Sequence, residues 1–118
     1  MQPLTAAQLL QVWEAGELQH PIDRALTLLG SALPGQTRAV LASYSIGRRD
    51  ALLLSLRELT LGSQMDCHSA CPACSEPLEF SLNVRDIQAP PIPESSIDHQ
   101  LVIDRTTYRL RVPTSVDL

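Results

Sequence analysis

The sequence predicts an α+β fold, with a small N-terminal helical bundle, a zinc-knuckle-like turn and a three-stranded antiparallel sheet. Apolar residues recur with helical periodicity in the first half and alternate with polar residues in the second, and three cysteines cluster between the halves. With 118 residues, 44% of them hydrophobic, the chain is long enough to bury one core. We therefore expect a helical region over 1–62 and a cysteine knuckle with strands over 63–118, sharing that core.

Two short helices are predicted at the N-terminus. Thr5 and Gln8 have the spacing of a capping box, which predicts a helix start at Thr5. The next helix follows His20, with Pro21 at its first position, and we expect it to end at Gly30.

Two further helices complete the bundle, a short one over 38–44 and a long one over 46–61. Ser45 is the expected N-cap of the long helix, and Gly62 its stop. Its predicted apolar face consists of Leu52, Leu53, Leu56 and Leu59.

The strands are predicted from alternation of apolar and polar side chains. Residues 78–84 alternate, a proline-rich stretch at 89–93 predicts a stiff connector, and 101–103 with 107–112 form a hairpin across a turn at 104–106. The side chains expected to face inward are Tyr108, Leu110 and Val112.

The C-terminal residues 113–118 have the pattern of a helix start, with a proline, a Thr or Ser cap and an acidic residue. This pattern predicts that a further helical segment belongs after Leu118. A frayed terminus is the alternative.

The cysteine cluster is the candidate site. Cys71 and Cys74 have the two-residue spacing that lets two thiolates converge on one tetrahedral metal. Cys67 is the candidate third ligand and His68 the nearest candidate for the fourth, which predicts a structural zinc ion. A full zinc ribbon has a second such pair, and this chain has none.

Several alternatives remain open for this cluster. Because adjacent residues seldom both point at one metal, His20, His99 or a partner chain could replace His68. The cysteines could instead be reduced and partly buried in a degenerate knuckle, since Ser75 stands where a knuckle usually has glycine. Redox chemistry is the third possibility, although a thioredoxin-type pair begins a helix, whereas a strand follows here.

Charge and hydropathy exclude several classes of protein. The net charge is −4 and all nine basic residues are arginines, dispersed among acids, which argues against a nucleic-acid partner. The pair Arg48 and Arg49, followed by Asp50, predicts a solvated helix face. No apolar run approaches the about 18 residues of a membrane span. An odd cysteine count and the absence of a secretion signal predict a cytoplasmic protein.

No catalytic motif is present in the sequence. It lacks a phosphate-binding glycine loop, Gly-x-Ser-x-Gly and His-Glu-x-x-His, and no histidine stands where it would activate a cysteine. We therefore expect no enzymatic activity.

The order of motifs resembles the baseplate hub assembly chaperones of T-even-like phages and related proteins of contractile injection systems. The segments that carry the resemblance are His20-Pro21-Ile22-Asp23-Arg24-Ala25-Leu26, Ser45-Ile46-Gly47-Arg48-Arg49-Asp50, Leu54-Ser55-Leu56-Arg57, Leu61-Gly62, Cys71-Pro72-Ala73-Cys74, Leu78-Glu79-Phe80 and Tyr108-Arg109-Leu110-Arg111-Val112-Pro113-Thr114. The resemblance implies an assembly factor or structural component of a contractile-tail baseplate or hub, with protein partners.

The residues themselves also favour an interaction protein. An ordered core without a catalytic set, and a sheet that needs a cover, suggest contacts through the leucine face of 46–61 and the outer strand. The alternatives are a small zinc-ribbon adaptor or transcriptional regulator, and a thiol enzyme.

Overall fold

The helices come first in the chain and the strands follow, as the α+β prediction requires. The computed structural model describes residues 1–90 and 98–118, so most of the proline-rich connector predicted at 89–93 lies outside the described residues. The elements are α1 (Ala6–Gly16), α2 (Pro21–Ala32), α3 (Arg38–Ala42), α4 (Ile46–Leu61), β1 (Gln64–Ala70), β2 (Pro77–Asn83), α5 (Val84–Ile87), β3 (Asp98–Ile103), β4 (Thr106–Arg111) and the 3₁₀ turn η2 (Ser115–Asp117).

The predicted caps set the helix ends. The Thr5 hydroxyl accepts a hydrogen bond from the Gln8 amide, and the Gln8 side chain accepts one from the Thr5 amide, which completes the capping box. The Ser45 hydroxyl likewise accepts from the Arg48 amide at the start of α4. Gly62 ends α4 with φ at 91°, a conformation that favours glycine. The bounds predicted for α4 are confirmed.

The core lies among α1, α2, α3 and α4. Helix α2 continues two residues past the predicted end at Gly30, to Ala32, which is fully buried. The buried members of the two core clusters are Leu4, Ala32 and Leu56 in one, and Leu26, Leu29 and Leu41 in the other.

The leucine face of α4 mainly builds this internal core. Leu56 is buried, and Leu52 and Leu53 pack against the second cluster. Leu59 alone of the four predicted leucines is more than half exposed. The partner surface expected on this face is therefore largely occupied by the chain itself.

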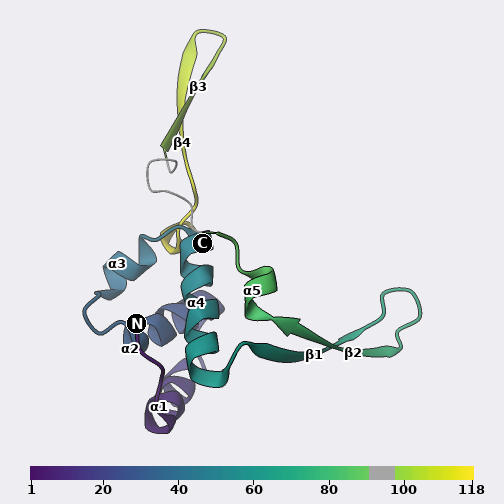
Figure 1. Cartoon of the computed structure of the whole chain (residues 1–118). Coiled ribbons are helices and arrows are strands. Elements are labelled where there is room, and N and C mark those ends of the chain that lie inside the picture. Colours follow the sequence, from purple (N-terminus) through teal and green to yellow (C-terminus); the bar gives the residue numbers. More distant parts are fainter. Residues whose placement is uncertain (91–97) are drawn as a thin grey trace.

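Polar side chains of α4 hold the surrounding segments by hydrogen bonds and one ion pair. They reach the N-terminal residues, the start of β1 and both ends of α5. The pairs are Thr60 with the Leu4 amide, Arg57 with the Gly62 and Gln64 carbonyls, Glu58 with Arg85, and Ser55 with Gln88. These bonds leave α4 on several sides, so the helix supports several other segments of the fold. In Figure 1, α4 lies at the centre of the helical part.

Arg49 contradicts the prediction of a solvated face. Only 9% of the accessible surface of Arg49 is exposed. Its Nη1 donates a hydrogen bond to the Ser115 hydroxyl at 3.1 Å, and its Nε donates one to the Asp50 carboxylate at 2.8 Å. The prediction was wrong because the C-terminal segment crosses the start of α4 and covers this guanidinium, a contact between residues 66 positions apart.

Backbone pairing fixes the C-terminal segment to α4. Ser45 and Thr114 form an isolated antiparallel bridge, and the Ile46 amide donates to the Pro113 carbonyl at 3.0 Å. The segment therefore supplies an acceptor to one of the first amides of α4, which have no partner within the helix.

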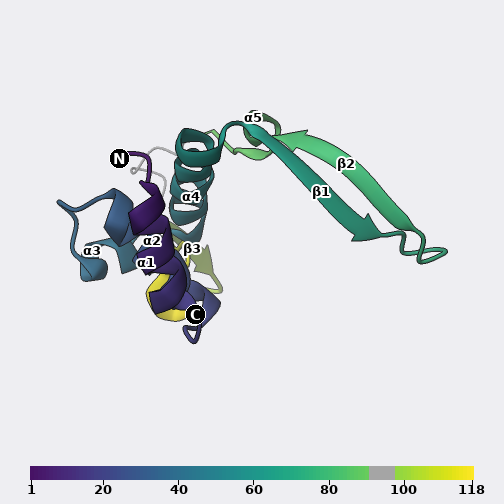
Figure 2. The ribbon, with the colours of Figure 1, turned by 90° about the horizontal axis from the view of Figure 1, so that it is seen from below.

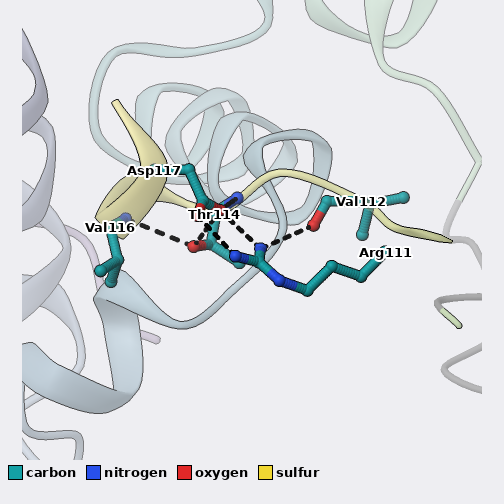
Figure 3. Close-up of polar contacts among 5 residues, drawn as sticks. All are labelled: Arg111, Val112, Thr114, Val116 and Asp117. Atoms are coloured by element: carbon teal, nitrogen blue, oxygen red, sulfur yellow. Dashed lines mark hydrogen bonds and ion pairs between the residues drawn. The ribbon is translucent and has the colours of Figure 1, made fainter. Parts of the chain in front are cut away.

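The helix start predicted at 113–118 is present as the single turn η2. Thr114 and Asp117 form its capping box, and Arg111 binds the Asp117 carboxylate with both terminal nitrogens, at 2.5 and 2.6 Å (Figure 3). The hydrogen bonds from Arg111, together with those from the Thr114 amide and hydroxyl, lower the pKa of Asp117.

The strands form two separate hairpins, which corrects the prediction of one three-stranded sheet. Strand β2 pairs with β1, immediately before the cysteine turn, and β3 pairs with β4. The prediction missed β1 because Gln64–Ala70 contains few strongly apolar residues. The short loop between β1 and β2 makes their pairing entropically cheaper than pairing with β3. Asn83 then caps α5, which ends β2.

Both hairpins project away from the helices. In Figures 1 and 2 the β1–β2 hairpin extends to one side of the helical part, and Figure 1 shows β3–β4 extending from it in a different direction. The radius of gyration is 17.7 Å, whereas a compact chain of this length has about 13.5 Å. The hairpins therefore present surface that the helices do not cover.

We expect Ser115→Ala to lower the free energy of unfolding by about 1–3 kcal/mol, because it removes a hydrogen-bond partner of the buried Arg49 guanidinium. Urea titration of the purified chain measures the change. Ser69→Ala, on an exposed strand position, is the control and should change stability by less than about 0.5 kcal/mol. Equal effects of the two substitutions would contradict the role given to Ser115.

Asp117→Asn should lower the melting temperature at pH 7, because asparagine cannot form the ion pair with Arg111. A carboxyl whose pKa is lowered by folding stabilises the fold above its unfolded pKa of about 3.9 and loses that effect as the pH falls further. The difference between wild type and variant should therefore shrink below about pH 4.

The control for this pH series is Asp104→Asn, which removes a charge in the exposed β3–β4 turn. A stability difference for Asp117→Asn that stays constant from pH 7 to pH 3 would refute the ion-pair explanation. Differential scanning fluorimetry of both variants across that range makes the comparison.

Candidate functional site

The β1–β2 hairpin places the two N-terminal members of the cysteine cluster on opposite faces. Cys67 lies opposite Phe80 in the register, and His68 lies opposite Glu79. Adjacent residues of a strand point to opposite sides, so Cys67 shares the Phe80 face and His68 does not. The Cys67 thiol is 3.7 Å from the Met65 carbonyl, toward the base of the hairpin.

Cys71 and Cys74 lie together in the loop at the tip of this hairpin. The nearby amides of Ala73 and Cys74, and then the Cys74 thiol, lower the pKa of the Cys71 thiol, because they favour the thiolate. The two thiols therefore lie close enough to interact.

The loop closes through a left-handed residue. The Ser75 amide donates to the Cys71 carbonyl and the Cys71 amide to the Glu76 carbonyl, each at 2.8 Å. Ser75 has φ at 62°, a conformation that is uncommon for residues other than glycine and costs of order 1 kcal/mol. The knuckle geometry is thus kept although serine replaces the usual glycine.

The four predicted ligands do not form one set in this structure. Cys67 precedes Cys71 by four residues along an extended strand, a separation of about 13 Å at the usual rise per residue. Within residues 1–90 and 98–118, no group of three or more His, Cys, Asp or Glu side chains could hold a metal ion. Of the four predicted ligands, Cys71 and Cys74 share one loop, between β1 and β2.

The β1–β2 hairpin has one apolar face. Residues that pair across it share a face, so Leu82 lies beside Met65, Phe80 beside Cys67, and Leu78 beside Ser69. Leu78 and Phe80 each retain more than 40% of their accessible surface. The predicted alternation is confirmed for 78–83, whereas Val84 belongs to α5 and is buried. The helices leave this face of the hairpin partly open.

The β3–β4 hairpin has a second apolar face. Leu101 pairs with Tyr108, His99 with Leu110, and Ile103 lies on the same side. We call Leu101, Ile103, Tyr108 and Leu110 the β3–β4 apolar face. All four side chains are about half exposed. Of the three side chains predicted to point inward, Tyr108 and Leu110 lie on this half-exposed face, and Val112 lies beyond the end of β4 and is half-buried.

A shallow apolar hollow also lies between α1 and α2. It has a volume of about 440 Å³ and is lined by Leu9, Val12, Trp13 and Leu28 among others. Trp13 is 66% exposed at this site. Arg24 borders the hollow, and its guanidinium donates to the Gly16 and Gln19 carbonyls. The hollow therefore offers mainly apolar surface for contact with another molecule.

No helix among the described residues has the length and apolarity needed to cross a membrane. The chain matched no curated protein and no solved structure. A family model described as T4 bacteriophage base plate protein matches residues 7–118, nearly the whole chain. This chain therefore belongs to the T4 bacteriophage base plate protein family.

Proposed function

We propose that the protein is a non-enzymatic assembly factor or structural component of the baseplate or hub of a phage-like contractile tail. The family supports a baseplate role. The observation that carries the finer proposal is the pair of projecting hairpins, each with an apolar face only partly covered by its own chain. It acts through protein–protein contacts made by these faces.

The physical reason lies in the stability of a two-stranded hairpin. An isolated hairpin is marginally stable in water, and a third strand or another apolar surface is needed to support it. The β3–β4 apolar face pairs leucine, isoleucine and tyrosine side chains that another protein can bury. A baseplate subunit that packs on this face stabilises the hairpin and gains affinity from the same contact.

The shape also suits an adaptor between neighbouring subunits. The two hairpins leave the helical part in different directions (Figure 1), so each can contact a different protein. We propose that it acts in the cytoplasm, where its three cysteines remain reduced. No catalytic step is required for this role.

Leu110→Asp tests the proposal, with Val102→Asp as the matched control. Both place a carboxylate in the same hairpin, but Val102 pairs with Thr107 on the opposite face and is more exposed than Leu110. Burying a leucine side chain contributes about 1.5–3 kcal/mol. We therefore expect Leu110→Asp to lower the affinity for a baseplate partner at least about tenfold. The control should change it less than about threefold.

The measurement is calorimetric titration with each purified product of the neighbouring tail genes. Circular dichroism of both variants checks that the helical part remains folded. Failure of every tail protein to bind, or equal binding by wild type and Leu110→Asp, would refute the proposed interface. Binding to duplex DNA instead would favour the alternative, a small regulator.

A further inference from the structure

We propose that Cys71 and Cys74 form half of a tetrahedral zinc site, and that a second copy of this chain supplies the same two cysteines as the other half. The inference concerns the tip of the β1–β2 hairpin and does not rest on the baseplate function. It differs from the zinc site predicted within one chain, because Cys67 and His68 are not ligands.

Cys71 and Cys74 lie in one closed turn at the tip of the hairpin. They are separated by two residues, a spacing that lets two thiolates bind one metal. The turn is closed by two hydrogen bonds, from the Ser75 amide to the Cys71 carbonyl and from the Cys71 amide to the Glu76 carbonyl. Structural zinc is bound tetrahedrally by four ligands, so this turn supplies half of a set.

The backbone holds this arrangement although it is strained. Ser75 adopts the left-handed conformation immediately after Cys74, and its amide is bonded to the Cys71 carbonyl. The turn returns the chain to β2, since the Cys71 amide bonds to the Glu76 carbonyl. Ser75 therefore closes the turn in a conformation that glycine would adopt without strain.

The remaining two ligands have to come from outside this chain's described residues. Cys67 is about 13 Å away along the strand and its thiol lies beside the Met65 carbonyl. His68 is on the opposite face, in register with Glu79. No third histidine, cysteine or carboxylate joins the pair in residues 1–90 or 98–118.

A second knuckle satisfies the ligand requirement with no further component. Two-fold related knuckles contribute four thiolates, one of the common ligand sets of structural zinc. The pair lies at the end of a hairpin that extends from the helical part (Figure 2), where Cys74 is exposed. The residues between the ligands, Pro72 and Ala73, are small and exposed, so another tip can approach closely.

Titration of the reduced full-length chain with Co²⁺ and Zn²⁺ tests the proposal. We expect the ligand-field spectrum of tetrahedral Co²⁺ bound to four thiolates, one metal per two chains, and a monomer-to-dimer shift in sedimentation on adding zinc. Cys71→Ser and Cys74→Ser should weaken zinc binding more than about 100-fold, because loss of a ligand exceeds the 10–100-fold effect of outer-sphere changes. Cys67→Ser is the matched control and should leave stoichiometry and spectrum unchanged.

Other outcomes would overturn the proposal. One zinc ion per monomer, loss of binding in Cys67→Ser, or zinc binding that requires a different protein would each exclude a site shared by two copies. A Cys71–Cys74 disulfide that forms readily in a chain that binds no metal under reducing conditions would assign the pair to redox chemistry.

Ser75→Gly provides an independent test of the knuckle. Glycine adopts the left-handed conformation without strain, so the variant populates the zinc-binding conformation of the loop more fully. The affinity for zinc should therefore rise by up to about fivefold. Ser75→Ala removes the hydroxyl but retains the strain, and should leave the affinity unchanged. Equal affinities for all three proteins would show that the Ser75 conformation does not limit metal binding, and would remove this support for the site.

Discussion

Helix α4 supports the rest of the structure because its polar side chains form bonds on several sides. On one side of α4, Leu56 is buried in the core. On other sides, Arg49 binds the Ser115 hydroxyl of the C-terminal segment, and Arg57 binds the Gln64 carbonyl at the start of β1. Hydrogen bonds to these groups matter because an unpaired buried guanidinium costs more than the bond itself contributes. A small core with few aromatic residues is thus reinforced by directional contacts from one helix.

This support extends only to the bases of the hairpins. Arg57 and the bond between the Val84 amide and the Ser63 carbonyl hold β1–β2 where it leaves the helices, and the pairing of Ser45 with Thr114 does the same beyond β4. Farther out, among residues 1–90 and 98–118, each strand is paired with the other strand of its own hairpin. The hairpins therefore keep apolar side chains that are about half exposed, and a protein of a baseplate family has protein partners that could cover them.

The three cysteines lie in two different parts of the β1–β2 hairpin, its apolar face and the loop at its tip. Cys67 lies on the apolar face beside Phe80, where a thiol behaves as a small hydrophobic side chain. Cys71 and Cys74 lie beyond the last strand pair, where the loop conformation, including the left-handed Ser75, brings their sulfurs together. The cluster is therefore divided, because Cys67 lies within β1 whereas Cys71 and Cys74 lie in the loop that follows it.

Residue order alone identifies the features of this chain that depend on neighbouring residues. Thr5 with Gln8, Ser45 and Gly62 mark helix ends because a cap needs only local atoms, and the alternation at 78–84 identifies an amphipathic strand. Only the tertiary structure decided that β2 pairs with β1 and that Arg49 is covered by Ser115. Those contacts depend on which distant segments meet, and a charged residue followed by an acid has the same local pattern whether solvent or another segment covers it.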